Sequence, residues 1–177
     1  AHCDIYNLGY RGINYLIERG FTQIRAVLPK PRRDRPQPAM EGVRDALRDR
    51  GRETTDNTFL YTAAATEEAG YECIKDLFSN GGLQADALLS LNDNITRGLM
   101  FGLMEAGVRI PADLGIMSHA NRGSKILSPV PLTRLELDPA EYAAVLLRNC
   151  KQALNQQPLD TVHFKATLIP GKSCREA

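Results

Sequence analysis

The sequence lacks any apolar run long enough to cross a membrane. No stretch of the 177 residues approaches the roughly 18 consecutive apolar residues that a bilayer requires. The first ten residues, AHCDIYNLGY, have neither the basic start nor the continuous apolar core of a signal peptide. We therefore expect no membrane association and a cytoplasmic location.

An excess of one charge is also missing, because 22 Lys and Arg stand against 21 Asp and Glu, for a net charge of +1. A balanced chain does not have the basic signature of a nucleic-acid-binding domain. The four cysteines, at positions 3, 73, 150 and 174, form no CxxC pair. This spacing favours buried thiols in a reducing compartment over a disulfide framework or a zinc site.

Familiar catalytic signatures are absent as well. The sequence contains no GxSxG, GxGxxG, P-loop or HExxH motif, and no pair of carboxylates converges by its spacing. We therefore expect a protein that is not an enzyme and that holds no cofactor or metal.

What the sequence does contain is a regular alternation of strands and helices with short connections. Hydrophobic periodicity and turn residues predict helices over 4–20, 39–50, 66–78, 95–106 and 139–155, and strands over 23–28, 58–61, 87–91, 115–118, 133–137 and 162–169. Such alternation predicts the α/β class, with a parallel, doubly wound sheet covered by helices on both faces.

The most informative stretch runs from 85 to 119, ADALLSLNDNITRGLMFGLMEAGVRIPADLGIMSH. It predicts a strand, a helix that begins near Asn92 and Asp93, and a second strand, which together form a right-handed β-α-β unit. Ligands bind at the carboxyl ends of such strands. Asp93 is expected to cap the helix, whereas Asn92 suits either a cap or a contact to a ligand.

Five segments, in order, resemble the regulatory core of the LacI/GalR family of bacterial transcription regulators. They are YLIERGFTQIRAV, PAMEGVRDAL, TEEAGYECIKDLF, DALLSLNDNITRGLMFGLMEAGVRIPADLGIMSH and SPVPLTRLELDPAEYA, and the resemblance extends from Asp4 to about Ser173. It implies a fold of the periplasmic-binding-protein type, mainly its C-terminal lobe. Residues 1–131 and 156–177 would form that lobe, and 132–155 would belong to or lean on the N-terminal lobe. Operator DNA would be contacted only through a helix-turn-helix that is absent from this chain.

The resemblance also implies where a small-molecule effector binds, and three of the implied positions have lost their polar or aromatic groups. Ala39 stands where the family typically has Arg, Ala65 where an aromatic ring is common, and Ala120 where an Asp usually holds two hydroxyls. Each sugar hydroxyl left without a partner costs roughly 1–3 kcal/mol. The effector is therefore open among sugars, phosphosugars and nucleosides, and a neutral sugar is the least favoured.

Four residues remain as candidate ligand-binding residues: Asn92, Arg35, His119 and Asn121. Arg35 lies in the basic segment KPRRDR, which suits a phosphate or carboxylate but is more typical of a solvated, proline-stiffened loop. His119 and Asn121 follow the strand over 115–118, near the point where ligands bind in such sheets. A packed histidine without a ligand role is the alternative for His119.

The helix over 95–106 carries apolar residues on more than one face, so a second surface is expected to cover it. The resemblance implies a homodimer formed by Leu99, Phe101 and Leu103 together with the segment Ile126 to Leu132. The predicted function is an effector-sensing and dimerisation domain of a transcriptional regulator. The alternatives are a free-standing binding protein of the periplasmic type and a dimerisation module that has lost ligand binding.

Overall fold

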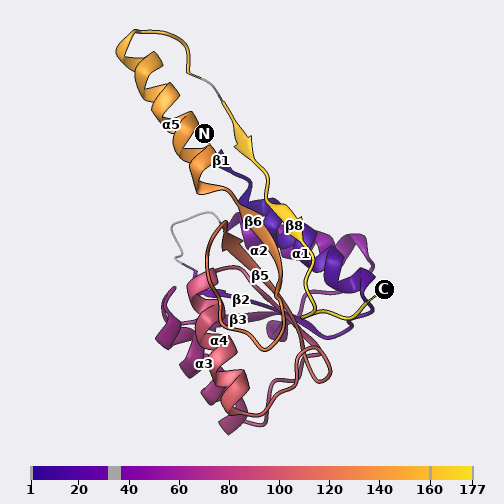
Figure 1. Ribbon diagram of the computed structural model, residues 1–177. Coiled ribbons are helices and arrows are strands. Elements are labelled where there is room, and N and C mark those ends of the chain that lie inside the picture. Colours follow the sequence, from indigo (N-terminus) through magenta and orange to yellow (C-terminus); the bar gives the residue numbers. More distant parts are fainter. Residues whose placement is uncertain (1, 32–36, 160, 177) are drawn as a thin grey trace.

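Six strands form one sheet in the order β3-β2-β4-β5-β6-β8 (Figure 1). This computed structural model describes residues 2–31, 37–159 and 161–176. The strands are β2 (Ile24–Pro29), β3 (Phe59–Thr62), β4 (Ala87–Ser90), β5 (Gly115–Asn121), β6 (Thr133–Leu137) and β8 (Thr167–Ile169). All neighbouring strands are parallel except β6 and β8, which are antiparallel. The expected α/β class and parallel sheet are confirmed.

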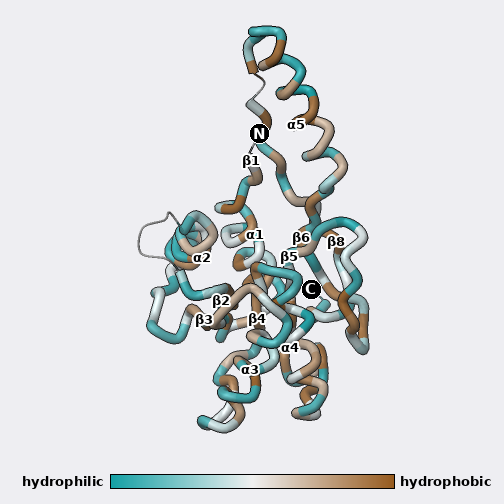
Figure 2. The backbone as a smooth tube through the Cα atoms, turned by 90° about the vertical axis from the view of Figure 1, so that its left-hand side faces the viewer, coloured by the Kyte–Doolittle hydropathy of each residue, from teal (hydrophilic) through white to brown (hydrophobic). Residues whose placement is uncertain are grey.

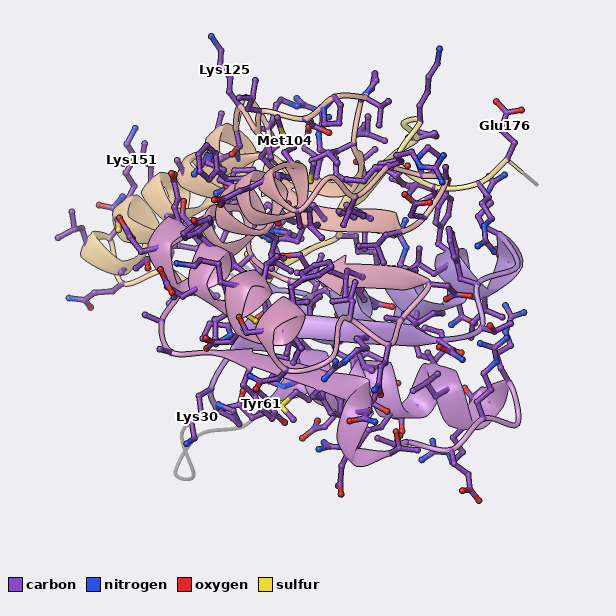
Figure 3. The ribbon with its side chains drawn as sticks, turned by 90° about the horizontal axis from the view of Figure 1, so that it is seen from below. Lys30, Tyr61, Met104, Lys125, Lys151 and Glu176 are labelled. Atoms are coloured by element: carbon purple, nitrogen blue, oxygen red, sulfur yellow. The ribbon has the colours of Figure 1, made fainter. Side chains whose placement is uncertain are left out.

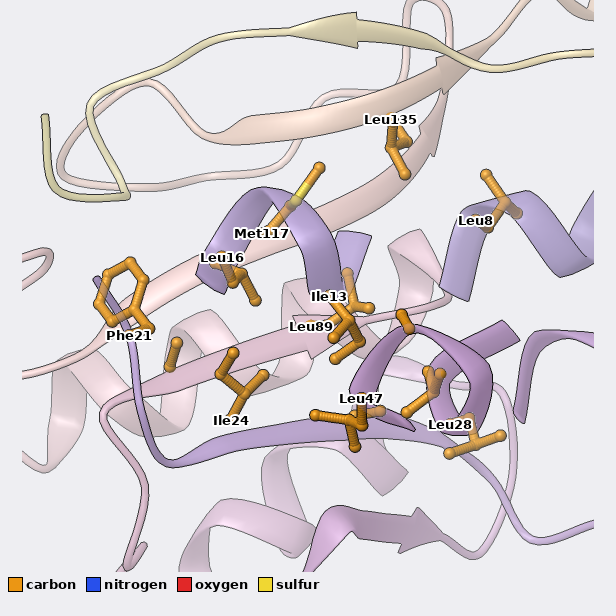
Figure 4. Packing of buried hydrophobic residues seen from close by; sticks show 14 of the residues in the cluster. Leu8, Ile13, Leu16, Phe21, Ile24, Leu28, Leu47, Leu89, Met117 and Leu135 are labelled. Atoms are coloured by element: carbon orange, nitrogen blue, oxygen red, sulfur yellow. The ribbon is translucent and has the colours of Figure 1, made fainter. Parts of the chain in front are cut away.

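Two pairs of helices cover the two faces of the sheet. Helices α1 (Ile5–Glu18) and α2 (Pro38–Asp49) pack on one face, and α3 (Glu67–Ser79) and α4 (Asp93–Glu105) pack on the other. Alternate residues of each strand point to opposite faces. Accordingly Leu89 joins the cluster under α1 and α2 (Figure 4), whereas Leu88 joins the cluster under α3 and α4. The helix ends agree with the sequence: the Thr66 side chain accepts a hydrogen bond from the backbone N–H of Ala69 at 3.2 Å, and Gly20 follows α1 with φ +78°.

One part of the chain projects away from the sheet (Figures 1 and 2). Helix α5 (Pro139–Leu154) lies beside a short parallel pair formed by β1 (His2–Cys3) and β7 (His163–Phe164). Leu147 is 65% exposed on α5 and Leu154 is 85% exposed. None of the helices in the described ranges has the length and hydrophobicity that a membrane span requires.

The strands differ from the sequence prediction in three places. The strand expected over 162–169 is divided into β7 and β8, and β1 was not expected. Strand β5 continues to Asn121, because its last residues pair with β6 as far as Leu137. Strand β6 pairs with β5 in the main sheet, and the chain leaves this sheet at Asp138 to enter α5.

Candidate ligand-binding edge

The carboxyl ends of β4, β5 and β6 meet at one edge of the sheet, where Asn92, Asp93, His119 and Asn121 lie. We call these four residues the ligand-binding edge. Three of the four predicted ligand-binding residues are therefore brought together by adjacent strands. The fourth, Arg35, lies outside the described residues.

Asn92 caps helix α4. Its Oδ1 accepts hydrogen bonds from the backbone N–H groups of Asn94 at 3.0 Å and Ile95 at 3.1 Å. These bonds satisfy two of the donors that every helix leaves free at its first turn. The expectation that Asp93 is the cap is therefore wrong. The side-chain amide nitrogen of Asn92 has no partner among the described residues, so it can donate to a ligand.

Asp93 instead fixes the loop that follows β5. Its Oδ2 accepts a hydrogen bond from the Ser124 hydroxyl at 2.7 Å, and the same hydroxyl accepts one from Nη2 of Arg97 at 2.7 Å. Arg97 also lies 3.8 Å from the Asp93 carboxylate and donates through Nε to the carbonyl of Lys125 at 3.0 Å. The start of α4 and the 121–125 loop are therefore held together at one side of the edge.

A buried cluster of three hydroxyls joins the strand ends to α4. The Thr96 hydroxyl lies 2.8 Å from those of both Ser90 on β4 and Ser118 on β5, and it donates to the Asn92 carbonyl at 2.8 Å. All three side chains are fully buried, where an unpaired hydroxyl is costly. The cluster fixes the position of Asn92 relative to β5. No such cluster was expected from the sequence, although Ser118 ends one predicted strand and Ser90 is the last residue but one of another.

His119 lies on β5 opposite Leu135 of β6. Met117 and Leu135 belong to the cluster under α1 and α2, so strand alternation places His119 on that face. The ring is half-buried, and its Nε2 is buried with no hydrogen-bond partner among the described residues. Burial lowers the pKa of His119, and the nearby Asp93 carboxylate opposes this shift in part. The histidine is therefore held in its neutral form at one side of the edge.

Opposite charges are paired at the end of β6. The Glu136 carboxylate is 10% exposed and lies 2.8 Å from Nε of Arg134 and 3.5 Å from Nε of Arg122. Arg122 also donates to Asp138, which caps α5. These acids are neutralised within the chain, whereas Asn121 is exposed beside them.

The three alanines leave methyl groups where the family resemblance implies ligand contacts. Ala120 is fully buried, Ala39 is half-buried at the start of α2, and Ala65 is exposed after β3. None of them can form a hydrogen bond through its side chain. With the Asp93 carboxylate engaged by Ser124 and Arg97, the polar groups that the edge offers to a ligand are those of Asn92, His119 and Asn121.

The outer face of α4 differs from the expected dimer surface. Leu99 and Leu103 are fully buried against the sheet and α3, so they cannot contact a second chain. The exposed apolar residues here are Phe101 at 62%, Met104 at 45% and Leu127 at 78%. They line a 430 Å³ groove together with Lys125 and Tyr71, whose ring meets that of Phe101 edge to face at 5.6 Å. Figure 3 shows Met104 and Lys125 on the same side of the molecule.

Comparison with known proteins gives one consistent result. The model of the periplasmic binding protein-like domain family matches residues 13–174. The transcriptional repressor PurR of Haemophilus influenzae is 28% identical over 148 residues, which are 83% of this chain and 41% of that protein. The transcriptional regulator GalR of Streptococcus thermophilus is 25% identical over 161 residues, 90% of this chain and 44% of that protein. The chain thus spans less than half the length of these relatives.

Solved structures have the same fold. A transcription regulator from Lactobacillus plantarum superposes with a TM-score of 0.83 at 18% identity, covering 98% of this chain and 67% of that one. A LacI family transcriptional regulator from Bifidobacterium animalis superposes with a TM-score of 0.82 at 20% identity, covering 99% of this chain and 63% of that one.

Proposed function

Because the chain belongs to the periplasmic binding protein-like domain family, we propose that it is the effector-sensing and dimerisation domain of a transcriptional regulator similar to LacI and GalR. The observation that supports this proposal is the unpaired amide of Asn92, held by its own cap at the carboxyl edge of a parallel sheet. Sheets of this kind bind small molecules at that edge. The role is recognition, not catalysis.

The effector belongs to the sugar, phosphosugar or nucleoside class. The Asn92 amide donates one hydrogen bond, and Asn121 and the neutral imidazole of His119 supply further polar groups. Ala39 and Ala120 leave neutral hydroxyls without side-chain partners, and Ala65 offers no ring to stack on a sugar, which favours a ligand with an anionic part. Arg35 is proposed to contact such an anionic part.

A second lobe is proposed to complete the site. Residues 1–131 and 156–177 then form the C-terminal lobe, and 132–155 lean on the other lobe through α5. Leu146, Leu147 and Leu154 on α5 are exposed here, which is expected of a helix whose covering partner is another part of the protein. Operator DNA is contacted through a region outside this chain, in a cytoplasmic regulator.

A homodimer is proposed through the groove on α4. Phe101, Met104 and Leu127 form its apolar centre, and the segment Ile126 to Leu132 continues it. Aromatic residues and methionine are enriched at the centre of protein interfaces. Glu67 and Lys125 at its rim carry opposite charges, so a second copy can place unlike charges opposite one another.

Thermal unfolding with a ligand panel tests the effector proposal. Glucose, glucose 6-phosphate and adenosine represent the three classes. A ligand at 100 times its Kd stabilises the folded state by about 2.7 kcal/mol. For a domain of this size that is a rise in Tm of roughly 5–11 °C.

Asn92→Asp sharpens the test. Asp is as good a cap as Asn, so the Tm without ligand stays nearly constant, but the side chain loses its donor. We expect a smaller ligand-induced rise in Tm for Asn92→Asp and an unchanged rise for the control Asn155→Asp, the same change at an exposed residue after α5. Equal rises in all three proteins would rule out a ligand contact of Asn92.

A dimerisation module without ligand binding is the second candidate, favoured by the alanines at 39, 65 and 120. It predicts that no member of the panel changes the Tm while the chain still dimerises. That pair of results would reject effector sensing and retain the dimer.

A further inference from the structure

A second hollow lies at the opposite edge of the sheet, where β2, β3 and β4 begin. Its volume is 750 Å³, within the range of small-molecule sites. The proposed function does not use it. Its polar lining is formed by Gln23, Arg25, Arg52, Glu53, Thr55, Asn57 and Gln84, which come from three separate segments of the chain.

Arg25 is an unpaired cation in this hollow. Its Nη1 donates to the Leu83 carbonyl at 3.2 Å, while its Nε is buried with no partner among the described residues. No carboxylate of the described chain forms an ion pair with it. Burial lowers the pKa of the guanidinium, because the hydrogen bond to Leu83 replaces only part of the hydration that it loses. A buried unpaired donor on a cation is a cost to the fold.

Arg52 is a second guanidinium on the same hollow. Its Nη1 donates to the carbonyls of Phe21 at 3.1 Å and Thr22 at 3.3 Å, which orient the side chain. It too forms no ion pair with a carboxylate of the described chain. The nearby Asp86 carboxylate is already occupied, because it accepts hydrogen bonds from the backbone N–H groups of Thr22 and Gln23. Two oriented guanidiniums therefore line one hollow, and neither forms an ion pair with a carboxylate of the described residues, although Glu53 also lies in the lining.

We propose that this hollow is a binding site for an oxyanion, the phosphate or carboxylate of a small polar metabolite, with Arg25 and Arg52 as its ligands. Guanidinium groups bind such oxygens with paired, charge-assisted hydrogen bonds. Gln23, Asn57 and Gln84 can hold the hydroxyls of the remainder of the molecule. The site is distinct from the ligand-binding edge, since it lies at the other ends of the same strands.

Arg25→Met separates this role from a structural one. Met is similar in length and needs no partner, so replacing an unpaired, partly buried cation is expected to leave the Tm unchanged or higher. Phosphate binding, measured by following backbone amide shifts during titration with inorganic phosphate, is expected to weaken about tenfold or more. Arg48→Met is the matched control, because Arg48 is 72% exposed on α2 outside the hollow.

In the wild-type chain the phosphate-induced shifts are expected at Thr22, Thr55 and Gln84, and they are expected to persist in Asn92→Asp. Citrate and glucose 6-phosphate, titrated in the same way, distinguish a carboxylate from a phosphate ligand. If Arg25→Met does not fold, Arg52→Met is measured instead, and the same weakening of phosphate binding is expected. Shifts outside the hollow, or phosphate binding unaltered in both variants, would overturn the proposal.

Discussion

The crossing of α3 and α4 provides a sharp test of the packing, through Gly98→Ala. A Cβ at Gly98 would lie 1.8 Å from the Glu67 carbonyl oxygen and 2.6 Å from the Tyr71 nitrogen. Both are backbone atoms, so no side chain can turn away. The two helices must separate by about 1.6 Å to reach an ordinary contact distance of 3.4 Å.

The expected cost follows from two opposing contributions. Overpacking of a tight contact costs about 1–3 kcal/mol, whereas Ala in place of Gly inside a helix gains about 1 kcal/mol. The separation also loosens contacts along the whole α3–α4 pair, which puts the overpacking cost at its upper end. We therefore expect Gly98→Ala to lower the free energy of unfolding by about 2 kcal/mol, or the Tm by roughly 4–8 °C.

Urea unfolding followed by circular dichroism measures this change as a lower midpoint at an unchanged m-value. Gly102→Ala on the same helix is the control, because its Cβ would meet the side chain of Ile74 at 2.9 Å and not a backbone atom. It is expected to cost less than Gly98→Ala. A Gly98→Ala chain as stable as the wild type would refute the close helix crossing.

Three further predictions concern the site and the proposed interface. Thr96→Val keeps the shape but removes the hydroxyl that joins β4, β5 and α4, so urea unfolding should show a loss of about 1–3 kcal/mol; an unchanged midpoint would contradict a role for the cluster. The folded-state pKa of His119 lies below its unfolded value near 6.5, so wild-type stability decreases as the pH falls through about 6.5. In His119→Phe the free energy of unfolding should change less between pH 8 and pH 5.5, and equal changes in both proteins would count against a buried neutral histidine. Phe101→Glu should weaken the dimer at least about tenfold in sedimentation equilibrium; the same loss in the control Leu154→Glu, which alters exposed α5, would point to a different interface.

Local signals in the sequence identified most of the sheet and its helices. Hydrophobic periodicity and helix-end residues were clear there: Thr66 caps α3, and Gly20 follows the end of α1. Strand β1 had no such signal. It exists only because His2 and Cys3 pair with residues 163 and 164 at the far end of the chain, and no local pattern encodes that contact.

The end of β5 was missed for a related reason. Ala120 and Asn121 are poor strand formers, and the sequence predicted a loop from Asn121 onwards. Pairing with β6 extends the strand to Asn121, so the side chains of residues 119–121 alternate between the two faces of the sheet. His119 is therefore fixed on the face of α1 and α2 by strand alternation.

The dimer surface shows what helical periodicity cannot decide. Apolar residues on two sides of a helix predict that both sides are covered. They do not indicate which side is covered by the same chain and which by a second one. The structure places Leu99 and Leu103 in the core and leaves Phe101 and Met104 exposed. Arg25 was overlooked in the same way, because one arginine at the start of an apolar strand is usually solvated. Its unpaired Nε and the presence of Arg52 in the same lining are what distinguish the hollow.

Residue type alone does not determine which of Asn92 and Asp93 caps α4. Both side chains are favoured caps, and the sequence offered no reason to prefer the first. Their roles are decided by Ser124, which follows Asp93 by 31 residues and donates to its carboxylate, and by Arg97, which lies one helical turn after Asp93 and donates to Ser124. With Asp93 bound to the loop, the cap is supplied by Asn92, whose oxygen is used by the helix and whose nitrogen is left for a ligand. A single amide thus connects the stability of α4 to recognition at the edge, which is why Asn92→Asp can change one property and leave the other intact.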